Sequence, residues 1–558
     1  MPILRVGGLC LAACLLSGLV QADELLRARL VPLDTDEANV AGVALASGPL
    51  LTDLYRTRGD RLAWDPARLA ALRRLLIATR VDGFYRSDFH FREIDAVLRE
   101  GGLAALPPGR RVEIDIVLSD SLLRYLHHHR FGKVDPRALD PSGTQVEQPS
   151  YGDLEQDLQA ALAADDLEAY VARQFRWPRF YRDLRAGLAR YREIAAAGGW
   201  SSVPDGPTLK PGMQDARVPV VRARLRATSD YSPEAAPPAD PLRYDAGVQA
   251  AVERFQARHG LAVDGLVGPQ TRAAMNVAIV QRIDQIRLNL ERMRWLANDL
   301  PGDFVLVNIP AYRVDLYRDG APIWSTRTIV GRPQRRTPVF RDELAYLEVN
   351  PTWTIPPTIL AEDILPNMRA DPGYLAERDL RVVDYRGNEI PPGTVDWNLP
   401  ADNFPYLLRQ APSDENALGR IKFMFPNQFS VYLHDTPQRG LFARPQRAFS
   451  SGCVRVQDPL RLAELVLDDP QRWTQASLAD LIATDETQVI RLRHPLAVLL
   501  AYWTAEGEGA GQVAFHPDIY GRDAALLEVL DGGPLRLRLA PPSEPATPVR
   551  TVDAAPDE

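Results

Sequence analysis

The chain has 558 residues and a formal net charge of −8, with 46% hydrophobic and 25% charged residues. The length suffices for three or four domains, and the composition is that of folded proteins, which excludes a collagen, a coiled-coil rod and a wholly disordered chain. The negative charge argues against nucleic acid as the main partner.

The first 22 residues are typical of a secretory signal peptide. Arg5 precedes an apolar run over 6–20, and small residues follow. A positive start, a short apolar core and a small-residue exit define such signals, and the run is shorter than the about 20 residues of a membrane span. We therefore expect an exported protein. Two alternatives remain, namely an uncleaved signal anchor and a lipobox that ends at Cys14. The uncleaved anchor is the only membrane contact that we expect.

Residues 23–207 predict a mainly helical domain. Apolar residues recur at helical spacing over 68–78 and 181–197. His127, His128 and His129 would point in three directions on a helix and cannot bind one metal together, since helical ligands need i, i+3 or i+4 spacing. We interpret them as a solvated helix end. Because the chain also lacks HExxH, CxxC and acidic calcium-loop patterns, we expect no metal and no cofactor.

A helical pair follows a Ser/Pro/Ala-rich loop. The helix over 248–259 ends at Gly260, and the next begins near Pro269. The string AVERFQARHGLAVDGLVGPQTRAAMN resembles the second half of the small helical peptidoglycan-binding module. With 218–225 as its first helix, this module would cover 208–277. A plain helical hairpin is the alternative.

Strand patterns begin after a connecting helix over 278–302. Alternating apolar runs predict a β-rich domain over 303–530, with strands at 304–309, 313–317, 323–330 and 345–349. Residues 364–416 are Pro-rich and weakly periodic, which indicates a lid, a binding loop or disorder. Residues 531–558 predict a disordered tail. The whole is a multidomain α+β chain: a helical scaffold domain with an inserted helical module, then a β-rich domain with a capping insertion.

Cys453 is a candidate nucleophile. Signal cleavage would leave it as the only thiol in a disulfide-forming compartment, although a buried structural cysteine is the alternative. Alternation over 429–433 predicts a strand that ends at His434, and Asp458 with Pro459 predicts a helix start after Val456.

These residues suit acyl chemistry. If 453–456 is extended, Cys453 and Arg455 share one face. His434 would raise the reactivity of the thiol, and the backbone N–H of Gly452 would stabilise an oxyanion. Arg455 would pair with a substrate carboxylate or form a structural ion pair.

VYLHDTP at 431–437 and SSGCVRV at 450–456 resemble the YkuD-type L,D-transpeptidase domain, in its large periplasmic YcbB-like branch. NPTWTIP at 350–356, NALGRIKFMFPN at 416–427, YWT at 502–504 and DIYGRD at 518–523 are similar to further motifs of that branch. Many family members have a histidine where this chain has Ser451, which puts any inherited role for that position in doubt.

The resemblance implies a cysteine acyltransferase that joins two peptidoglycan stems. Cys453 would attack a donor tetrapeptide stem, expel D-alanine, and pass the acyl group to an acceptor stem as a 3–3 cross-link. The insertion would cap the site, and carbapenems would acylate the thiol. Tyr432, Ser451, Arg455 and Trp353 are candidate substrate-binding residues, with a core role for Trp353 equally open.

Two other functions use the same residues. An L,D-carboxypeptidase would hydrolyse the thioester with water, and the choice depends on how a lid excludes water. A non-catalytic peptidoglycan-binding scaffold would need no intact thiol site.

Overall fold

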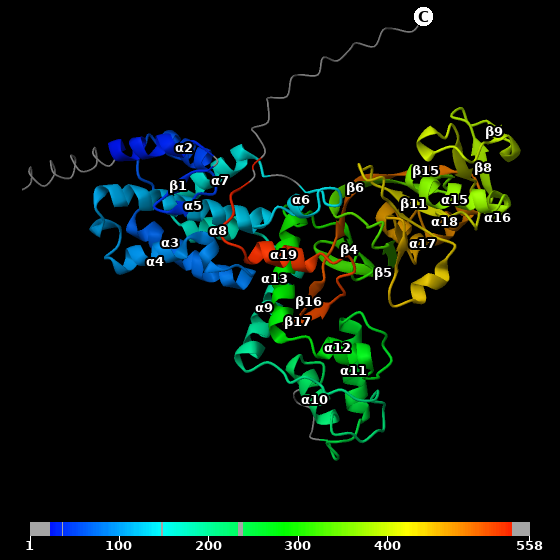
Figure 1. The fold of residues 1–558 in the computed structure, drawn as a ribbon, viewed down its shortest axis with the longest axis horizontal. Coiled ribbons are helices and arrows are strands. Elements are labelled where there is room, and N and C mark those ends of the chain that lie inside the picture. Colours follow the sequence, from blue (N-terminus) through cyan, green and yellow to red (C-terminus); the bar gives the residue numbers. More distant parts are fainter. Residues whose placement is uncertain (1–22, 36, 147–148, 233–237, 538, 540–558) are drawn as a thin grey trace, which may run out of the picture. The chain divides into compact units, whose positions relative to one another are not determined.

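The computed structural model describes residues 23–35, 37–146, 149–232, 238–537 and 539. It divides into two compact units (Figure 1). Unit 1 holds the described residues up to 135, those within 147–177 and those from 525 onwards, and unit 2 holds 136–146 and those within 178–524. The predicted signal peptide and most of the predicted tail lie outside the described residues. None of the helices among the described residues is long and apolar enough to cross a bilayer.

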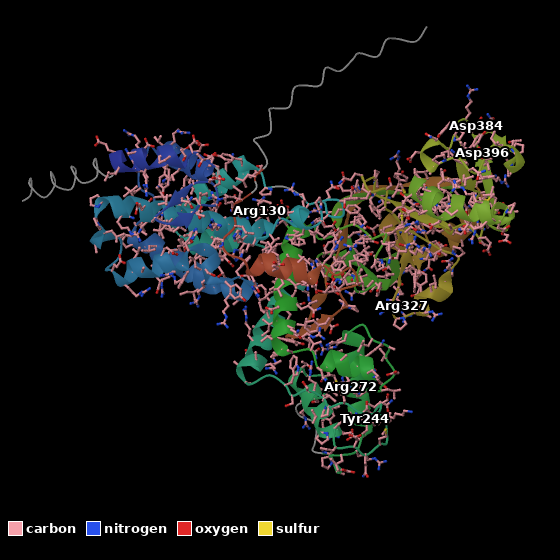
Figure 2. All side chains as sticks on the ribbon, in the orientation of Figure 1. Arg130, Tyr244, Arg272, Arg327, Asp384 and Asp396 are labelled. Atoms are coloured by element: carbon pink, nitrogen blue, oxygen red, sulfur yellow. The ribbon has the colours of Figure 1, made fainter. Side chains whose placement is uncertain are left out.

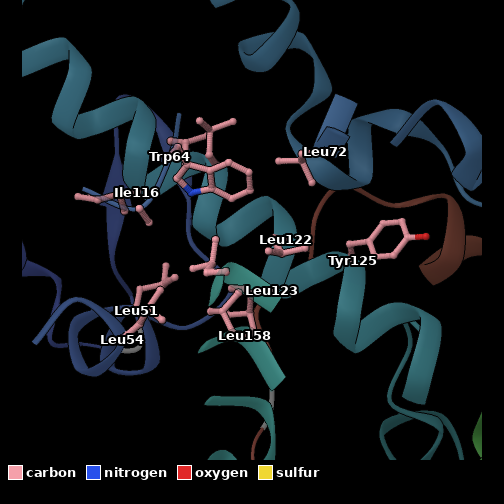
Figure 3. Packing of buried hydrophobic residues seen from close by; sticks show 14 of the residues in the cluster. Leu51, Leu54, Trp64, Leu72, Ile116, Leu122, Leu123, Tyr125 and Leu158 are labelled. Carbon is pink, nitrogen blue, oxygen red and sulfur yellow. The ribbon is translucent and has the colours of Figure 1, made fainter. Parts of the chain in front are cut away.

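Unit 1 is helical and packs around one long helix. Its helices are α2 (Gly48–Thr57), α3 (Pro66–Ala78), α4 (Phe91–Arg99), α5 (Pro108–Phe131), α7 (Tyr151–Ala163) and α8 (Leu167–Gln174). Pro at the first helical position and the Asp65 side chain, which accepts from the Arg68 N–H, fix the start of α3. Leu51, Trp64, Leu72 and Leu158 gather around Leu122 of α5 (Figure 3).

The three histidines are buried, so their prediction as a solvated helix end was wrong. His127, His128 and His129 lie in the last turns of α5, with exposed fractions of 8%, 0% and 2%. The His129 ring stacks on Tyr125 at 4.0 Å and lies 5.1 Å from the Phe84 ring. Because α5 is enclosed by the other helices, even its polar end contacts the core.

These histidines make the stability of unit 1 dependent on pH. Burial and the charge of Arg124 lower the pKa of His127 to about 3, and burial lowers the pKa of His128 too. The unfolded histidines bind protons below about pH 6.5 while the folded ones stay neutral, so stability falls as the pH drops below that value. We expect His127 alone to lower the free energy of unfolding by about 2–3 kcal/mol at pH 4.5 relative to pH 7. Thermal melts at pH 7 and 4.5 check this. His127→Asn should flatten the dependence, and an equally steep loss in that variant would contradict the assignment.

The start of the predicted tail is ordered. The N–H of Leu537 donates to the carbonyl of Ala46 at 2.9 Å, and Arg124 donates to the carbonyl of Leu535. Lys133 donates to the carbonyls of Leu530 and Gly532, both at 2.7 Å. The residues after α19 (Asp523–Asp531) therefore belong to the helical unit up to the last described ones.

In unit 2, α9 (Arg179–Ala196) and α13 (Ile279–Leu296) pack on each other and on the hairpin of β16 (Ala505–Gly509) and β17 (Gln512–Phe515). The prediction assigned 181–197 to the scaffold domain, whereas the contacts place α9 in unit 2.

The small helical module has its own core. It contains α10 (Val218–Ala227), α11 (Ala246–Arg258) and α12 (Pro269–Met275) around a cluster that includes Phe255. Gly260 follows α11 with a φ of +61°, a value that favours glycine. Tyr244, labelled in Figure 2, donates to the carbonyl of Gly265 at 2.6 Å. Arg258 pairs with Asp230 and donates to the carbonyl of Val513, which seats the module on β17.

The β-rich part is a sheet that closes on itself. The strand order is β13-β5-β14-β12-β11-β6-β15-β3-β4, and β4 also pairs with β5. The four strands predicted at its start are present. The bounds are β3 (Phe304–Asn308), β4 (Arg313–Arg318), β5 (Ala321–Gly331), β6 (Phe340–Val349), β11 (Ile421–Met424), β12 (Leu433–His434), β13 (Ala448–Ser450), β14 (Val454–Val456) and β15 (Gln488–Ala501). Two helices follow β14, namely α17 (Pro459–Leu467) and α18 (Gln475–Ile482).

The insertion is a folded subdomain. Its small sheet contains β7 (Trp353–Thr354), β10 (Leu407–Gln410), β8 (Leu380–Val383) and β9 (Glu389–Ile390). With α14 (Pro357–Ile359), a π-helical turn over Leu360–Ile364, α15 (Leu365–Ala370) and α16 (Tyr374–Glu377), it encloses a separate apolar cluster. It begins at Trp353, ahead of the predicted start at 364.

Candidate active site

Cys453 lies between β13 and β14, directly after Gly452. Gly452 is buried and has a φ of +124°, which only glycine adopts without strain. Val454 and Val456 are fully buried, whereas Cys453 and Arg455 are partly exposed on the opposite face. The predicted alternation is therefore confirmed.

The cysteine loop is supported by a chain of hydrogen bonds. The hydroxyl of Thr337 donates to the carbonyl of Gly452 at 2.7 Å. Tyr520 accepts from the Thr337 N–H at 3.1 Å and donates to the carbonyl of Gly331 at 2.7 Å. Sequence reasoning missed Thr337 and gave Tyr520 no role, although the motif at 518–523 contains it. Both act as positioning residues, because they hold the backbone next to the thiol.

Polar groups near the thiol come from the segment before β12 and from β11. Sγ lies 3.9 Å from the carbonyl oxygen of Ser430. Burial raises the pKa of the Cys453 thiol, while hydrogen bonds from Tyr432 and the charges of Lys422 and Arg455 act in the opposite direction. The Lys422 ammonium lies 4.5 Å from the centre of the Tyr432 ring. Burial outweighs these groups, so the thiol holds its proton more firmly than a free cysteine and needs a base to become a thiolate.

His434 lies on the same face one strand away. In the parallel pairing of β12 with β14 it is opposite Arg455, so Tyr432 is the residue beside Cys453. Its Nδ1 is 2.5 Å from the carbonyl oxygen of Asp435, which favours a proton on that nitrogen. Burial and the charge of Arg455 lower the pKa of His434 to about 3, so the ring is neutral at ordinary pH.

Within the described structure no hydrogen bond joins His434 to Cys453. Catalytic hydrogen bonds of this kind often form only once substrate is bound, so their absence here does not remove His434 as the candidate base. The structure adds Tyr432 as a second group able to act on the sulfur.

The predicted oxyanion donor already has a partner. The N–H of Gly452 donates to the hydroxyl of Ser450 at 3.2 Å, and that hydroxyl donates to the carbonyl of Cys453 at 2.5 Å. An oxyanion at this position would replace the Ser450 oxygen as the acceptor.

The remaining candidates divide into two groups. Arg455 donates to the side-chain oxygen of Gln438 at 2.8 Å and forms no ion pair among the described residues. Ser451 is exposed beside the thiol. Trp353 lies in β7 and packs against the core of the insertion, which favours the core role left open for it.

Arg335 links the cysteine loop to the insertion, and sequence reasoning missed it. Its guanidinium donates to the Ser451 hydroxyl at 2.9 Å, to Glu362 at 2.9 Å and to Asp363 at 3.0 Å. The side chain is only 7% exposed. Local sequence patterns could not reveal this role, because Arg335 lies 27 residues from Glu362 and 116 residues from Ser451 in the chain.

Comparison with known families divides the chain into three parts. Residues 302–490 match the L,D-transpeptidase catalytic domain (YkuD), 49–188 match the Scaffold domain and 214–275 match the "Putative peptidoglycan binding domain". A protein of Haemophilus influenzae named "Putative L,D-transpeptidase" is 42% identical over 242 residues, which are 43% of this chain and 48% of that protein. The match thus spans about half the length of this curated relative.

Solved structures with similar parts have low overall similarity. An L,D-transpeptidase from Stackebrandtia nassauensis is 14% identical, with 56% of this chain and 99% of that chain covered and a TM-score of 0.23. An L,D-transpeptidase from Xylanimonas cellulosilytica is 16% identical, with 53% and 98% covered and a TM-score of 0.16. At such TM-scores the similarity says nothing about individual residues.

Proposed function

From the YkuD L,D-transpeptidase catalytic domain and the peptidoglycan-binding domain that this chain carries, we propose that it forms 3–3 cross-links between peptidoglycan stems in the periplasm. The observation that carries the proposal is the half-buried thiol of Cys453, which follows a glycine with a φ of +124° and lies beside the Tyr432 and His434 face.

In the first step the Cys453 sulfur attacks the carbonyl carbon of the third residue of a tetrapeptide stem. The carbon–nitrogen bond to the terminal D-alanine breaks, a thioester forms, and D-alanine leaves with the proton that His434 took from the thiol. In the second step the side-chain amine of an acceptor stem attacks the thioester. The new amide bond forms, the carbon–sulfur bond of the thioester breaks, and the proton lost by the amine returns to the sulfur through His434.

The alternative function is an L,D-carboxypeptidase, in which water attacks the same thioester. Mass analysis of muropeptides after incubation of the pure protein with tetrapeptide fragments separates the possibilities. Dimers indicate transfer, tripeptides indicate hydrolysis, and unchanged tetrapeptides indicate a binding scaffold.

The folded insertion favours transfer, because it is anchored beside the thiol and can restrict water. Arg335→Gln removes the charge that Glu362 and Asp363 bind. We expect the ratio of tripeptide to dimer to rise about three- to tenfold, since a looser insertion admits more water.

Arg386→Gln is the matched control for this prediction. It removes one exposed positive charge from the insertion, on the turn between β8 and β9. Its product ratio should equal that of the wild type. The same ratio in both variants and the wild type would contradict a role for Arg335 in water exclusion.

The proposed partners follow from this chemistry. Donor and acceptor tetrapeptide stems are the substrates, and carbapenems are expected to acylate Cys453. Among the described residues no group of three or more His, Cys, Asp or Glu side chains is placed to hold a metal ion, and none of the proposed steps uses one.

A further inference from the structure

An open pocket of about 470 Å³ lies on the closed sheet of the catalytic domain, away from Cys453. The turn between β3 and β4, the middle of β5, and residues flanking β13 and β14 form its walls. Arg327, labelled in Figure 2, is its exposed cation. The pocket lining includes Tyr312, Arg313, Thr326, Arg327, Arg447 and Gln457.

Two of its arginines have no anionic partner in the described part of the chain. Arg447 donates to the carbonyls of Thr328 at 3.1 Å, Tyr312 at 3.2 Å, Arg444 at 2.8 Å and Pro445 at 3.4 Å. Arg327 reaches the carbonyl of Phe442 at 3.4 Å. Carbonyl oxygens accept these hydrogen bonds but bring no net charge. Burial and the charge of Arg327 lower the pKa of Arg447 to about 10, so Arg447 remains cationic at neutral pH.

The third arginine of the pocket differs. Arg313 is paired with Asp315 at 2.8 Å and with Glu506 at 2.9 Å. The chain therefore supplies carboxylates to one arginine and leaves two adjacent ones without any. An anion in the pocket would relieve the repulsion between Arg327 and Arg447.

The pocket is on the same face as the thiol. Cys453, Arg455 and Gln457 alternate along one chain segment, so their side chains share a face. The N–H of Gln457 donates to the carbonyl of Arg327 at 3.1 Å, which places Arg327 beside it on β5. At about 3.3 Å per residue, Gln457 lies about 13 Å from Cys453. In a donor stem the free carboxylates flank the reacting carbonyl within about one residue, whereas in an acceptor stem they are separated from the reacting amine by the length of a side chain, so an acceptor spans more of this distance.

We propose that this pocket binds a free carboxylate of a peptidoglycan stem whose reacting group is at Cys453. The inference rests on the proposed function and extends it to substrate recognition. The exposed Arg327 guanidinium matches the two oxygens of a carboxylate, and Arg447 adds a second positive charge. The Thr326 hydroxyl and the Gln457 amide supply further hydrogen bonds. Donor and acceptor stems share this chemistry.

Binding is measured with the full chain carrying Cys453→Ala, so that no turnover occurs. The probe is the free stem tetrapeptide, titrated by calorimetry at low and moderate salt. Arg327→Gln should weaken the Kd about tenfold, because a bidentate charged contact is lost. This variant is the cleaner one, since Arg327 has one weak backbone hydrogen bond whereas Arg447 supports a loop. Unchanged thermal melts verify the fold.

Arg444→Gln is the matched control, because Arg444 is exposed on the same loop but outside the pocket lining. Two further probes carry an amide in place of one carboxylate, at the second residue or at the terminal D-alanine. One of these two probes should bind the Cys453→Ala protein about tenfold more weakly than the unmodified tetrapeptide does, and its Kd should not change when Arg327→Gln is added. The carboxylate that this probe lacks is then the one that the pocket recognises. An unchanged Kd in Arg327→Gln, an equal loss in Arg444→Gln, or full sensitivity with both amides would overturn the proposal.

A separate incubation shows which stem the pocket binds, and it tests the proposed function independently of binding. The wild type and Arg327→Gln, both with Cys453 intact, are incubated with tetrapeptide alone, and the release of D-alanine is followed. If the release of D-alanine depends on Arg327, the pocket binds the donor stem. If only dimer formation depends on Arg327, the pocket binds the acceptor stem. If the wild type makes no product while the binding difference persists, the proposed chemistry fails and the carboxylate site stands.

Discussion

Replacing Cys453 by alanine should abolish release of D-alanine and formation of cross-linked dimers, to below a few per cent of the wild-type rate. No other thiol is present among the described residues, and the thioester cannot form without a sulfur nucleophile. Cys453 is partly exposed, and alanine is smaller than cysteine. The free energy of unfolding of the variant should therefore be within about 1 kcal/mol of that of the wild type.

Two measurements separate loss of chemistry from loss of structure. Thermal melting of Cys453→Ala should match that of the wild type, and intact-protein mass after carbapenem treatment should show an adduct only in the wild type. Cys453→Ser keeps the shape of the side chain but replaces the thiol with a much weaker nucleophile, so it should also be inactive. Residual cross-linking above a few per cent in Cys453→Ala would remove Cys453 as the nucleophile.

Local patterns predicted the immediate surroundings of the thiol correctly. The period of two along an extended segment placed Val454 and Val456 inside and Cys453 outside. The Asp458 cap and Pro459 predicted the start of α17, and the Asp458 side chain does accept from the N–H of Arg461. Such features depend on neighbours in the sequence, so they can be inferred without the fold.

The same reasoning was wrong where a single residue breaks a pattern. Alternation over 429–433 predicted a strand, but β12 contains only Leu433 and His434. Ser430 has a φ of +53°, and the Asn427 side chain bonds the backbone of Val431, which together form a turn instead. This turn brings the carbonyl of Ser430 to the sulfur.

Contacts between distant segments could not be predicted from local patterns. Arg335, Thr337 and Tyr520 support the cysteine loop from positions more than 60 residues away in the chain. His127 to His129 were misjudged for the same reason, since their burial depends on Phe84 and Phe89 folding back over α5. Without the arrangement of elements, an arginine or histidine in a polar stretch looks solvated.

His434→Ala should lower the rate of Cys453 acylation by a carbapenem about 10²–10⁴-fold, which is the usual cost of losing a general base. The wild-type rate should stay nearly constant from pH 7 to pH 5. The pKa of His434 is lowered to about 3, so its neutral, proton-accepting form persists through this range, whereas an ordinary histidine of pKa 6.5 would lose most of it. In His434→Ala the rate should recover as the pH rises towards 9 and above, because hydroxide then forms the thiolate. Burial raises the pKa of the thiol, which places this recovery above the ordinary value of about 8.5.

The other groups near the sulfur provide the alternatives to this dyad. If Arg455 and the backbone stabilise a pre-formed thiolate, Arg455→Ala will show the recovery at high pH and His434→Ala will not. If Tyr432 is the group that matters, Tyr432→Phe will lower the rate as much as His434→Ala, since the Tyr432 side chain acts to lower the pKa of the Cys453 thiol. Acylation rates of the three variants between pH 5 and about 10.5, followed as the mass adduct on Cys453, decide among them. An unchanged rate in His434→Ala across that range would end the role of His434 as the base, and the hydrogen bond that the described structure lacks would then never form in the reaction.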